Sequence, residues 1–159
     1  MNWFPLSAPK LMNEVEAITR DRVLELLNDA VWAPNDGLRE PWRFIYADRK
    51  PGRLHGFLQN PASAYLLVVM KEDADPHKRK EDFAAVCCLV QNFVLLAAEK
   101  GLGVQWTMRE WFYDSQLSRD YGVGEKERLV AVLELGQDGP FSWEGFVTEA
   151  APAFKVDRI

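Results

Sequence analysis

The chain has 159 residues, of which 48% are hydrophobic, and its formal net charge is −5. This length suits one domain, over residues 1–159, with one substantial core. The acidic balance argues against nucleic-acid binding, because phosphate contacts need an excess of basic residues. The sequence lacks the roughly 18 to 20 continuous apolar residues of a membrane span and the cationic start of a secretory signal. We therefore expect a cytoplasmic protein that binds neither nucleic acid nor a membrane.

The first half of the chain is predicted to alternate helix and strand. Residues 14–33 form a helix, ended by Pro34, with its charges opposite an apolar side made of Val23, Leu24, Leu27, Ala30 and Val31. A short strand follows at 42–47 ("WRFIYA"), and 53–58 indicates a weak helix. Residues 64–71 ("AYLLVVMK") are a continuous apolar run, which predicts a strand buried on both faces.

The strongest helix signal lies at residues 82–100. Asp82 is a candidate N-cap, and Gly101 follows at the usual C-terminal stop. The basic cluster before it, "PHKRKED" at 76–82, is interpreted as a solvated loop rather than a functional patch. The helix is apolar almost all round, through Phe83, Val86, Cys87, Leu89, Val90, Phe93, Val94, Ala97 and Ala98. We expect it to be buried on nearly every side, either in a large core or between subunits.

The remaining segments complete the pattern. "GVQWT" at 103–107 predicts a short strand, 115–122 a short helix and 128–136 a final strand. Beyond these the regular signals fade, and residues 137–159 are interpreted as an arm that carries spaced aromatic residues. Because helices and strands alternate along the chain, we predict a mixed α+β layout.

The two cysteines are neighbours, Cys87 and Cys88, in the predicted long helix. Adjacent helical residues point about 100° apart and cannot easily bridge each other. We therefore expect two small core residues in a reducing compartment. His55 and His77 lie far from them in the sequence and show no ligand spacing, so no metal site is predicted.

Three segments carry a resemblance to a known family. A helix ending in Ala33-Pro34 leads through the turn "NDGLRE" into "PWRF", which opens a strand. "DFAAVCCLVQNFVLLAAEKGLGVQW" joins a long helix to a GLG-x-x-W strand, and "KERLVAVLELG" is a late strand that ends in Leu-Gly. Their order and separation, over roughly residues 20–136, resemble the small, single-domain branch of the nitroreductase family of FMN-dependent oxidoreductases. The resemblance implies a mixed central sheet flanked by helices, with a long buried central helix.

The resemblance also implies an activity. It implies an enzyme with FMN as cofactor and NAD(P)H as co-substrate, which transfers a hydride through the flavin N5 in a ping-pong reaction. The acceptors would be nitroaromatic- or quinone-like, and no catalytic acid or base from the protein is required. The flavin sites of this family lie at a two-fold interface and draw residues from both chains, which implies a homodimer.

Two segments are expected to lie beside the flavin ring. The turn after Ala33-Pro34 approaches the ring and the ribityl chain in the resembled family, and a Pro-Trp pair sets its exit. The strand after the glycine-rich turn runs along the ring. In this sequence the matching residues are Trp32, Asn35, Asp36, Pro41, Trp42, Trp106, Thr107 and Met108. For Trp42, a position in the core is an equally good interpretation.

The phosphate end of the cofactor has fewer matching residues. Family members usually begin with an Arg-Arg-Ser type motif that holds the FMN phosphate, and residues 1–19 contain no such motif. The substitutes that the sequence offers are Arg20, Arg22, Lys155 and Arg158. Losing two charged hydrogen bonds would weaken FMN binding by about 3 to 6 kcal/mol. The alternative hypothesis is therefore a family member that has lost FMN and acts as a binding or interaction module.

The chain itself favours a homodimer. A monomer of this size cannot easily cover a helix that is apolar on nearly every side. Residues 137–159 add large apolar side chains outside any amphipathic element, namely Phe141, Trp143, Phe146 and Phe154. A partner subunit is a natural place to bury them. The alternative is that the helix and the arm pack on the chain's own sheet.

Overall fold

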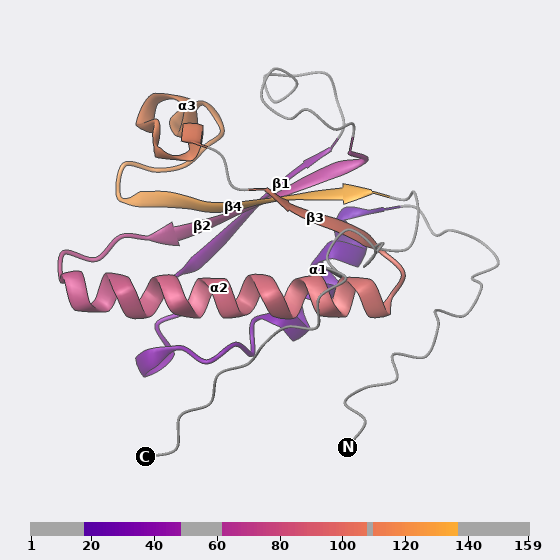
Figure 1. The fold of residues 1–159 in the computed structure, drawn as a ribbon, viewed down its shortest axis with the longest axis horizontal. Helices are drawn as coiled ribbons and strands as arrows, with labels where there is room; N and C mark the ends of the chain where they lie inside the picture. The colour runs from indigo at the N-terminus through magenta and orange to yellow at the C-terminus, as the bar shows by residue number, and fades with distance from the viewer. Residues whose placement is uncertain (1–17, 49–61, 108–109, 137–159) are drawn as a thin grey trace, which may run out of the picture.

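A computed structural model describes residues 18–48, 62–107 and 110–136. Its centre is a four-stranded sheet with the order β1-β2-β4-β3 (Figure 1). The strands are β1 (Trp42–Asp48), β2 (Ala64–Lys71), β3 (Gly103–Thr107) and β4 (Glu127–Gly136). All three pairings among them are antiparallel, whereas the resemblance implied a mixed sheet.

Helices cover the two faces of this sheet. The long helix α2 (Pro76–Glu99) lies along one face, and α1 (Arg20–Ala30) packs against it. The short helix α3 (Ser115–Asp120) lies on the opposite side of the sheet (Figure 1). Two 3-10 turns complete the described elements, η1 (Asp36–Leu38) and η3 (Glu110–Tyr113). The prediction of an α+β fold with a long central helix is confirmed.

Strand β2 is the centre of the core, as predicted from its continuous apolar run. Every residue from Ala64 to Met70 is buried. Its even-numbered side chains join the cluster under α1 and α2, and its odd-numbered side chains join a second cluster on the other face. This alternation is the two-residue period of a strand covered on both sides.

Helix α1 is shorter than predicted. It begins after Thr19, whose Oγ1 accepts a hydrogen bond from the Arg22 N–H at 3.2 Å, and it ends at Ala30 rather than residue 33. Its buried face consists of Val23, Leu26, Leu27 and Ala30. The prediction that Leu24 belongs to this face was wrong, since Leu24 is 42% exposed. The buried set follows the i, i+3, i+4, i+7 spacing of a helix, which selects Leu26 instead.

Helix α2 begins at Pro76, six residues before the predicted start. Asp75 is its N-cap, because its Oδ1 accepts from the His77 N–H at 2.8 Å, and proline is favoured at the first helical position. The segment 76–82 is therefore the first two turns of the helix and not a loop. Asp82, predicted as the cap, lies inside the helix and is buried.

The burial of α2 is one-sided in the single chain. Its inner face packs on the sheet and on α1, whereas Leu95 on the outer side is 50% exposed. The buried residues of the inner face are Asp82, Ala85, Val86, Leu89, Val90, Phe93 and Ala97. Cys87 is half-buried and Cys88 is exposed, so the prediction that both cysteines are core residues was wrong for Cys88. The length and composition of α2 would also allow it to cross a membrane. Its packing identifies it as the core helix of this fold.

The other boundaries lie close to the predictions. Strand β3 matches, and β1 and β4 are each one residue longer than predicted. Helix α3 ends at Asp120, because the chain turns at Gly122 with a φ of 86°, which favours glycine. The predicted helix at 53–58 and the arm at 137–159 lie outside the described residues.

Candidate functional site

The Ala33–Pro41 turn, between α1 and β1, has an uncommon backbone. Its φ angles are 57° at Gly37, 52° at Leu38 and 44° at Glu40. Glycine adopts such angles freely, but each of the other two residues costs on the order of 1 to 2 kcal/mol there. Asn35 stabilises this shape, because its Oδ1 accepts from the Glu40 N–H at 3.0 Å and its Nδ2 donates to the Ala33 carbonyl at 3.2 Å.

Arg39 joins this turn to helix α2. Its Nε and Nη2 donate to Oδ1 of Asp82 at 3.1 and 2.8 Å, and Nη2 also reaches Glu81 at 3.2 Å. Its Nη1 donates to Asp36, whose carboxylate is therefore engaged within the turn. These carboxylates, above all Asp82, raise the pKa of Arg39. Arg39 thus binds the turn to the central helix.

The apolar residues around the turn divide into exposed and buried groups. Trp32 is 85% exposed, and Leu38 at the tip of the turn is 82% exposed. Trp42 is only 8% exposed and belongs to the core under α2, which favours the core interpretation of this residue. Pro41 is buried and accepts a hydrogen bond from the Lys71 N–H at 2.8 Å, so it extends the β1–β2 pairing. Trp32 and Leu38 therefore form the accessible apolar surface of this region.

Trp106 and Thr107 end strand β3, at one edge of the sheet. Trp106 is 37% exposed and lies opposite Leu133 of β4, while Thr107 lies opposite Val132. Among the described strands β3 pairs only with β4, so alternate backbone N–H and C=O groups along its outer side are directed away from the sheet. Among the described strands, this edge therefore carries an exposed aromatic side chain beside outward-directed backbone groups.

Within one chain, Trp42 at the end of the turn and Trp106 on β3 lie far apart. Strands β1 and β3 are the opposite edges of the sheet, three strand spacings or about 14 Å apart. Through the strand pairing, Trp42 is aligned with Arg128 of β4, whereas Trp106 is aligned with Leu133. The stretch of β4 between these two positions adds about 16 Å along the strands. Trp42 and Trp106 therefore lie roughly 20 Å apart within a protomer.

Of the predicted phosphate ligands, the structure describes Arg20 and Arg22. Arg22 donates from Nη2 to the Lys100 carbonyl at 2.7 Å and so ties α1 to the end of α2. Arg20 is exposed at the start of α1, about 15 Å along the helix from the Ala33–Pro41 turn. Met108, Lys155 and Arg158 lie outside the described residues.

Arg43, next to Trp42, has a structural partner. Its Nε donates to Oε1 of Glu127 at 2.9 Å and its Nη2 to the Gly122 carbonyl at 2.9 Å, so the side chain reaches from β1 across β2 to β4. Glu127 also accepts from the Gly124 N–H at 2.7 Å. The hydrogen bond from Arg43 lowers the pKa of Glu127, against the opposing effect of burial, and it raises the pKa of Arg43.

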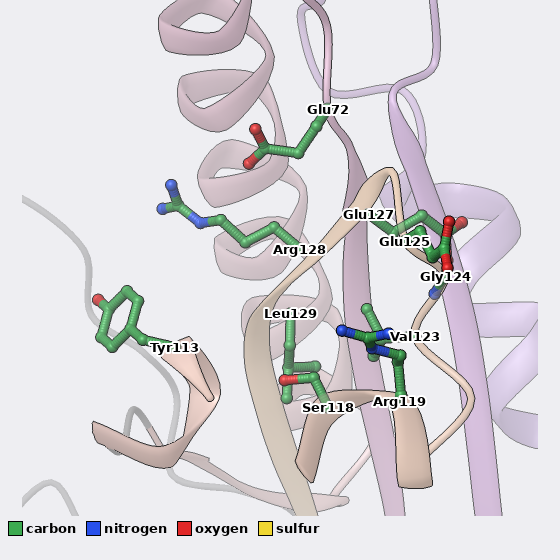
Figure 2. Close-up of a pocket in the computed structure, with 10 residues that line it drawn as sticks. All are labelled: Glu72, Tyr113, Ser118, Arg119, Val123, Gly124, Glu125, Glu127, Arg128 and Leu129. Carbon is green, nitrogen blue, oxygen red and sulfur yellow. The ribbon is translucent and has the colours of Figure 1, made fainter. Parts of the chain in front are cut away.

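A pocket of about 380 Å³ lies where β4 begins. Figure 2 shows Arg128 and Glu127 on opposite sides of β4, as strand alternation requires, with Glu72 on the side of Arg128. The guanidinium of Arg128 lies 4.8 Å from the ring centre of Phe83, a cation–π distance. The remaining lining residues are Tyr113, Ser118, Arg119, Val123, Gly124, Glu125 and Leu129. The size suits a small ligand, and the lining combines the apolar Val123 and Leu129 with the cations Arg119 and Arg128.

Sequence reasoning missed this pocket. The available signal was Arg128, a cation immediately before the apolar run Leu129–Leu133. Glu72 and Tyr113 come from segments 41 residues apart whose meeting depends on the fold. Among residues 18–48, 62–107 and 110–136, no group of three or more His, Cys, Asp or Glu side chains is placed to hold a metal ion.

Known proteins with a similar sequence support the resemblance. The model of the nitroreductase family matches residues 53–137, more than half of the chain. A Bacillus subtilis (strain 168) protein named "Putative NAD(P)H nitroreductase YfhC" is 34% identical over 138 residues, with 72% of this chain and 71% of that protein covered.

Solved structures agree at the level of the fold. A nitroreductase-like family protein from Bacillus cereus has a TM-score of 0.68 at 30% identity, with 92% of this chain and 83% of that chain covered. A Desulfovibrio desulfuricans structure, described as a "putative nitroreductase in complex with fmn", has a TM-score of 0.69 at 22% identity, with 86% and 88% covered. The sequence matches and the similar fold lead to one conclusion: the chain belongs to the nitroreductase family of oxidoreductases.

Proposed function

We propose that this protein is an FMN-dependent oxidoreductase that uses NAD(P)H to reduce nitroaromatic- or quinone-like acceptors. Membership of the nitroreductase family supports the reaction class. The names of two similar proteins, one an NAD(P)H nitroreductase and one crystallised with FMN, support the two cofactors. Bound FMN would supply the hydride chemistry itself.

The described residues fit the ring of a flavin. A flavin ring needs a flat apolar surface and hydrogen-bonding groups along its pyrimidine edge. The half-exposed Trp106 and the outward backbone groups of β3 provide these two features on the same strand. A second group of candidate ring contacts consists of Trp32, just before the turn, and Asn35 and Asp36 within it. In our proposal these residues bind and orient the ring, while Arg20, Lys155 and Arg158 are the candidates for the phosphate.

We further propose that the enzyme is a homodimer with each site shared between two chains. The observation that carries this proposal is the separation of roughly 20 Å between Trp42, where the turn enters β1, and Trp106. A single ring cannot contact both Trp42 and Trp106 in one protomer, but it can contact the residues around Trp42 in one chain and the β3 edge of its partner. The exposed side of α2, formed by Ala84, Cys88, Gln91 and Leu95, is mostly apolar and is a surface that such a partner could cover.

The second candidate function is a binding or interaction module without FMN. It is favoured by the absence of an Arg-Arg-Ser type motif in residues 1–19. It is also favoured by the engagement of three arginines, since Arg22, Arg39 and Arg43 all donate to groups of the chain itself.

Anaerobic titration separates the two functions. We expect purified protein incubated with FMN to show the flavin absorption band and to lose it on addition of NADPH or NADH. FMN should also bind more tightly than riboflavin, because only FMN carries the phosphate. A colourless protein that does not bind FMN even at high concentration would contradict the first function and support the second.

A further inference from the structure

The Ala33–Pro41 turn is more elaborate than a connection from α1 to β1 requires. Leu38 and Glu40 have φ angles of 52° and 44°, a region that side-chain-bearing residues rarely adopt. Leu38 is 82% exposed, so this backbone is not explained by burial of its side chain. Strained backbone of this kind persists only where surrounding contacts hold it, and it is concentrated at functional sites.

The contacts that hold it come mainly from one side chain. Arg39 stands between Leu38 and Glu40 and donates twice to Asp82, at 3.1 and 2.8 Å. Asp82 is 5% exposed and lies on the rigid central helix, 43 residues further along the chain. A guanidinium held by both Nε and Nη2 fixes direction as well as distance. Asn35 completes the turn through its bond to the Glu40 N–H.

We propose that Arg39 is a positioning residue for the cofactor. Through Asp82 it holds the Ala33–Pro41 turn in the shape that the turn needs to meet a flavin, without touching the flavin itself. This inference rests on the proposed FMN-dependent function. It assigns to Arg39 and Asp82 a role in FMN binding that is distinct from their contribution to the stability of the fold. The variants below distinguish these two roles.

The first experiment compares Arg39→Met with Arg43→Met. Both substitutions remove a guanidinium from a carboxylate, but Arg43 bonds to Glu127 on the opposite face of the sheet. We expect Arg39→Met to weaken FMN binding by on the order of tenfold or more, because a displaced ligand-contacting segment loses its alignment. Arg43→Met should lower the melting temperature yet change FMN affinity by less than about twofold. Equal FMN affinity in Arg39→Met and wild type would overturn the proposal.

A rescue experiment tests the mechanism. In the Arg39→Met background, Glu40→Gly removes the cost of a positive φ, whereas Glu40→Ala removes the same side chain and keeps that cost. If Arg39 acts by holding the strained backbone, Glu40→Gly recovers part of the FMN affinity and Glu40→Ala does not. Similar affinities in the two double variants would contradict this mechanism.

Hydrogen exchange gives a reading that does not depend on FMN. In the wild type the Glu40 N–H is bonded to Asn35, so its exchange reports the closed turn. We expect faster exchange at Glu40 in Arg39→Met and unchanged exchange in Arg43→Met. If the wild type fails to bind FMN, the proposed function fails, and the exchange rates still decide whether Arg39 holds the turn. Unchanged exchange in Arg39→Met would refute the inference by itself.

Discussion

Arg43 and Glu127 show how a single ion pair can link distant parts of this chain. They are 84 residues apart in sequence, yet the pair joins β1 to the start of β4. The 122–124 turn adds two hydrogen bonds, because Arg43 also donates to the Gly122 carbonyl and Glu127 accepts from the Gly124 N–H. Hydrogen bonds to charged groups contribute roughly 1.5 to 3 kcal/mol. Because the Arg43 side chain is 40% exposed, solvent screening lowers the expected contribution to about 1 to 2 kcal/mol.

This pair predicts a specific dependence of stability on pH. The folded-state pKa of Glu127 lies below its ordinary value of 4.5, so the stabilisation is present above pH 4.5 and is lost as pH falls through the folded-state value. We expect wild type and Glu127→Gln to differ in free energy of unfolding at pH 7 and to converge below pH 4.5. Denaturant unfolding across this range measures the difference. A difference that stays constant with pH would contradict the assignment.

A matched control lies two residues away. Glu125 is exposed and also lines the pocket, but it does not bond to Arg43. Glu125→Gln should therefore change the free energy of unfolding at pH 7 by less than about 0.5 kcal/mol.

At the scale of single residues, the sequence could predict candidate site residues but not the residues to which they bond. Trp32, Asn35 and Asp36 were predicted from the turn motif, and the structure adds that Asp36 is held by Arg39. The partner Asp82 was predicted to be a helix cap instead. An ion pair across 43 residues depends on the packing of α1, the turn and α2, which no local pattern contains.

At the scale of elements, strands were easier to predict than the start of the long helix. The apolar runs of β2, β3 and β4 define those strands almost to the residue. The start of α2 was misplaced because the charges in 76–82 suggested a loop. The physical signal was Asp75 followed by Pro76, a capping residue before the one helical position that favours proline.

The cap can be tested directly. We expect Asp75→Ala to destabilise the protein by about 1 kcal/mol, because the first N–H groups of α2 lose their side-chain acceptor. Lys80→Ala, at an exposed position of the same helix, serves as the control and should be close to neutral. Thermal unfolding of the two variants measures the contrast. An Asp75→Ala variant as stable as the control would place the start of the helix elsewhere.

At the scale of the whole molecule, the order of three motifs was enough to identify the family and the α+β class. It was not enough to show that β1 and β3 are opposite edges of the sheet, because strand order is a property of the folded chain. That arrangement separates Trp42, where the turn enters β1, from Trp106 within a protomer. The proposal of a shared site in a homodimer follows from this separation.

Subunit mixing tests that proposal most directly. Asn35→Ala damages the turn and Trp106→Ala damages the β3 edge, so each variant alone should have little NAD(P)H-dependent, FMN-supported reductase activity. After unfolding and refolding together, half of the dimers pair the two variants, and each such dimer has one site with both halves intact. We therefore predict recovery of about a quarter of the wild-type activity in the mixture. A mixture no more active than its separate components would contradict a flavin site built from two chains.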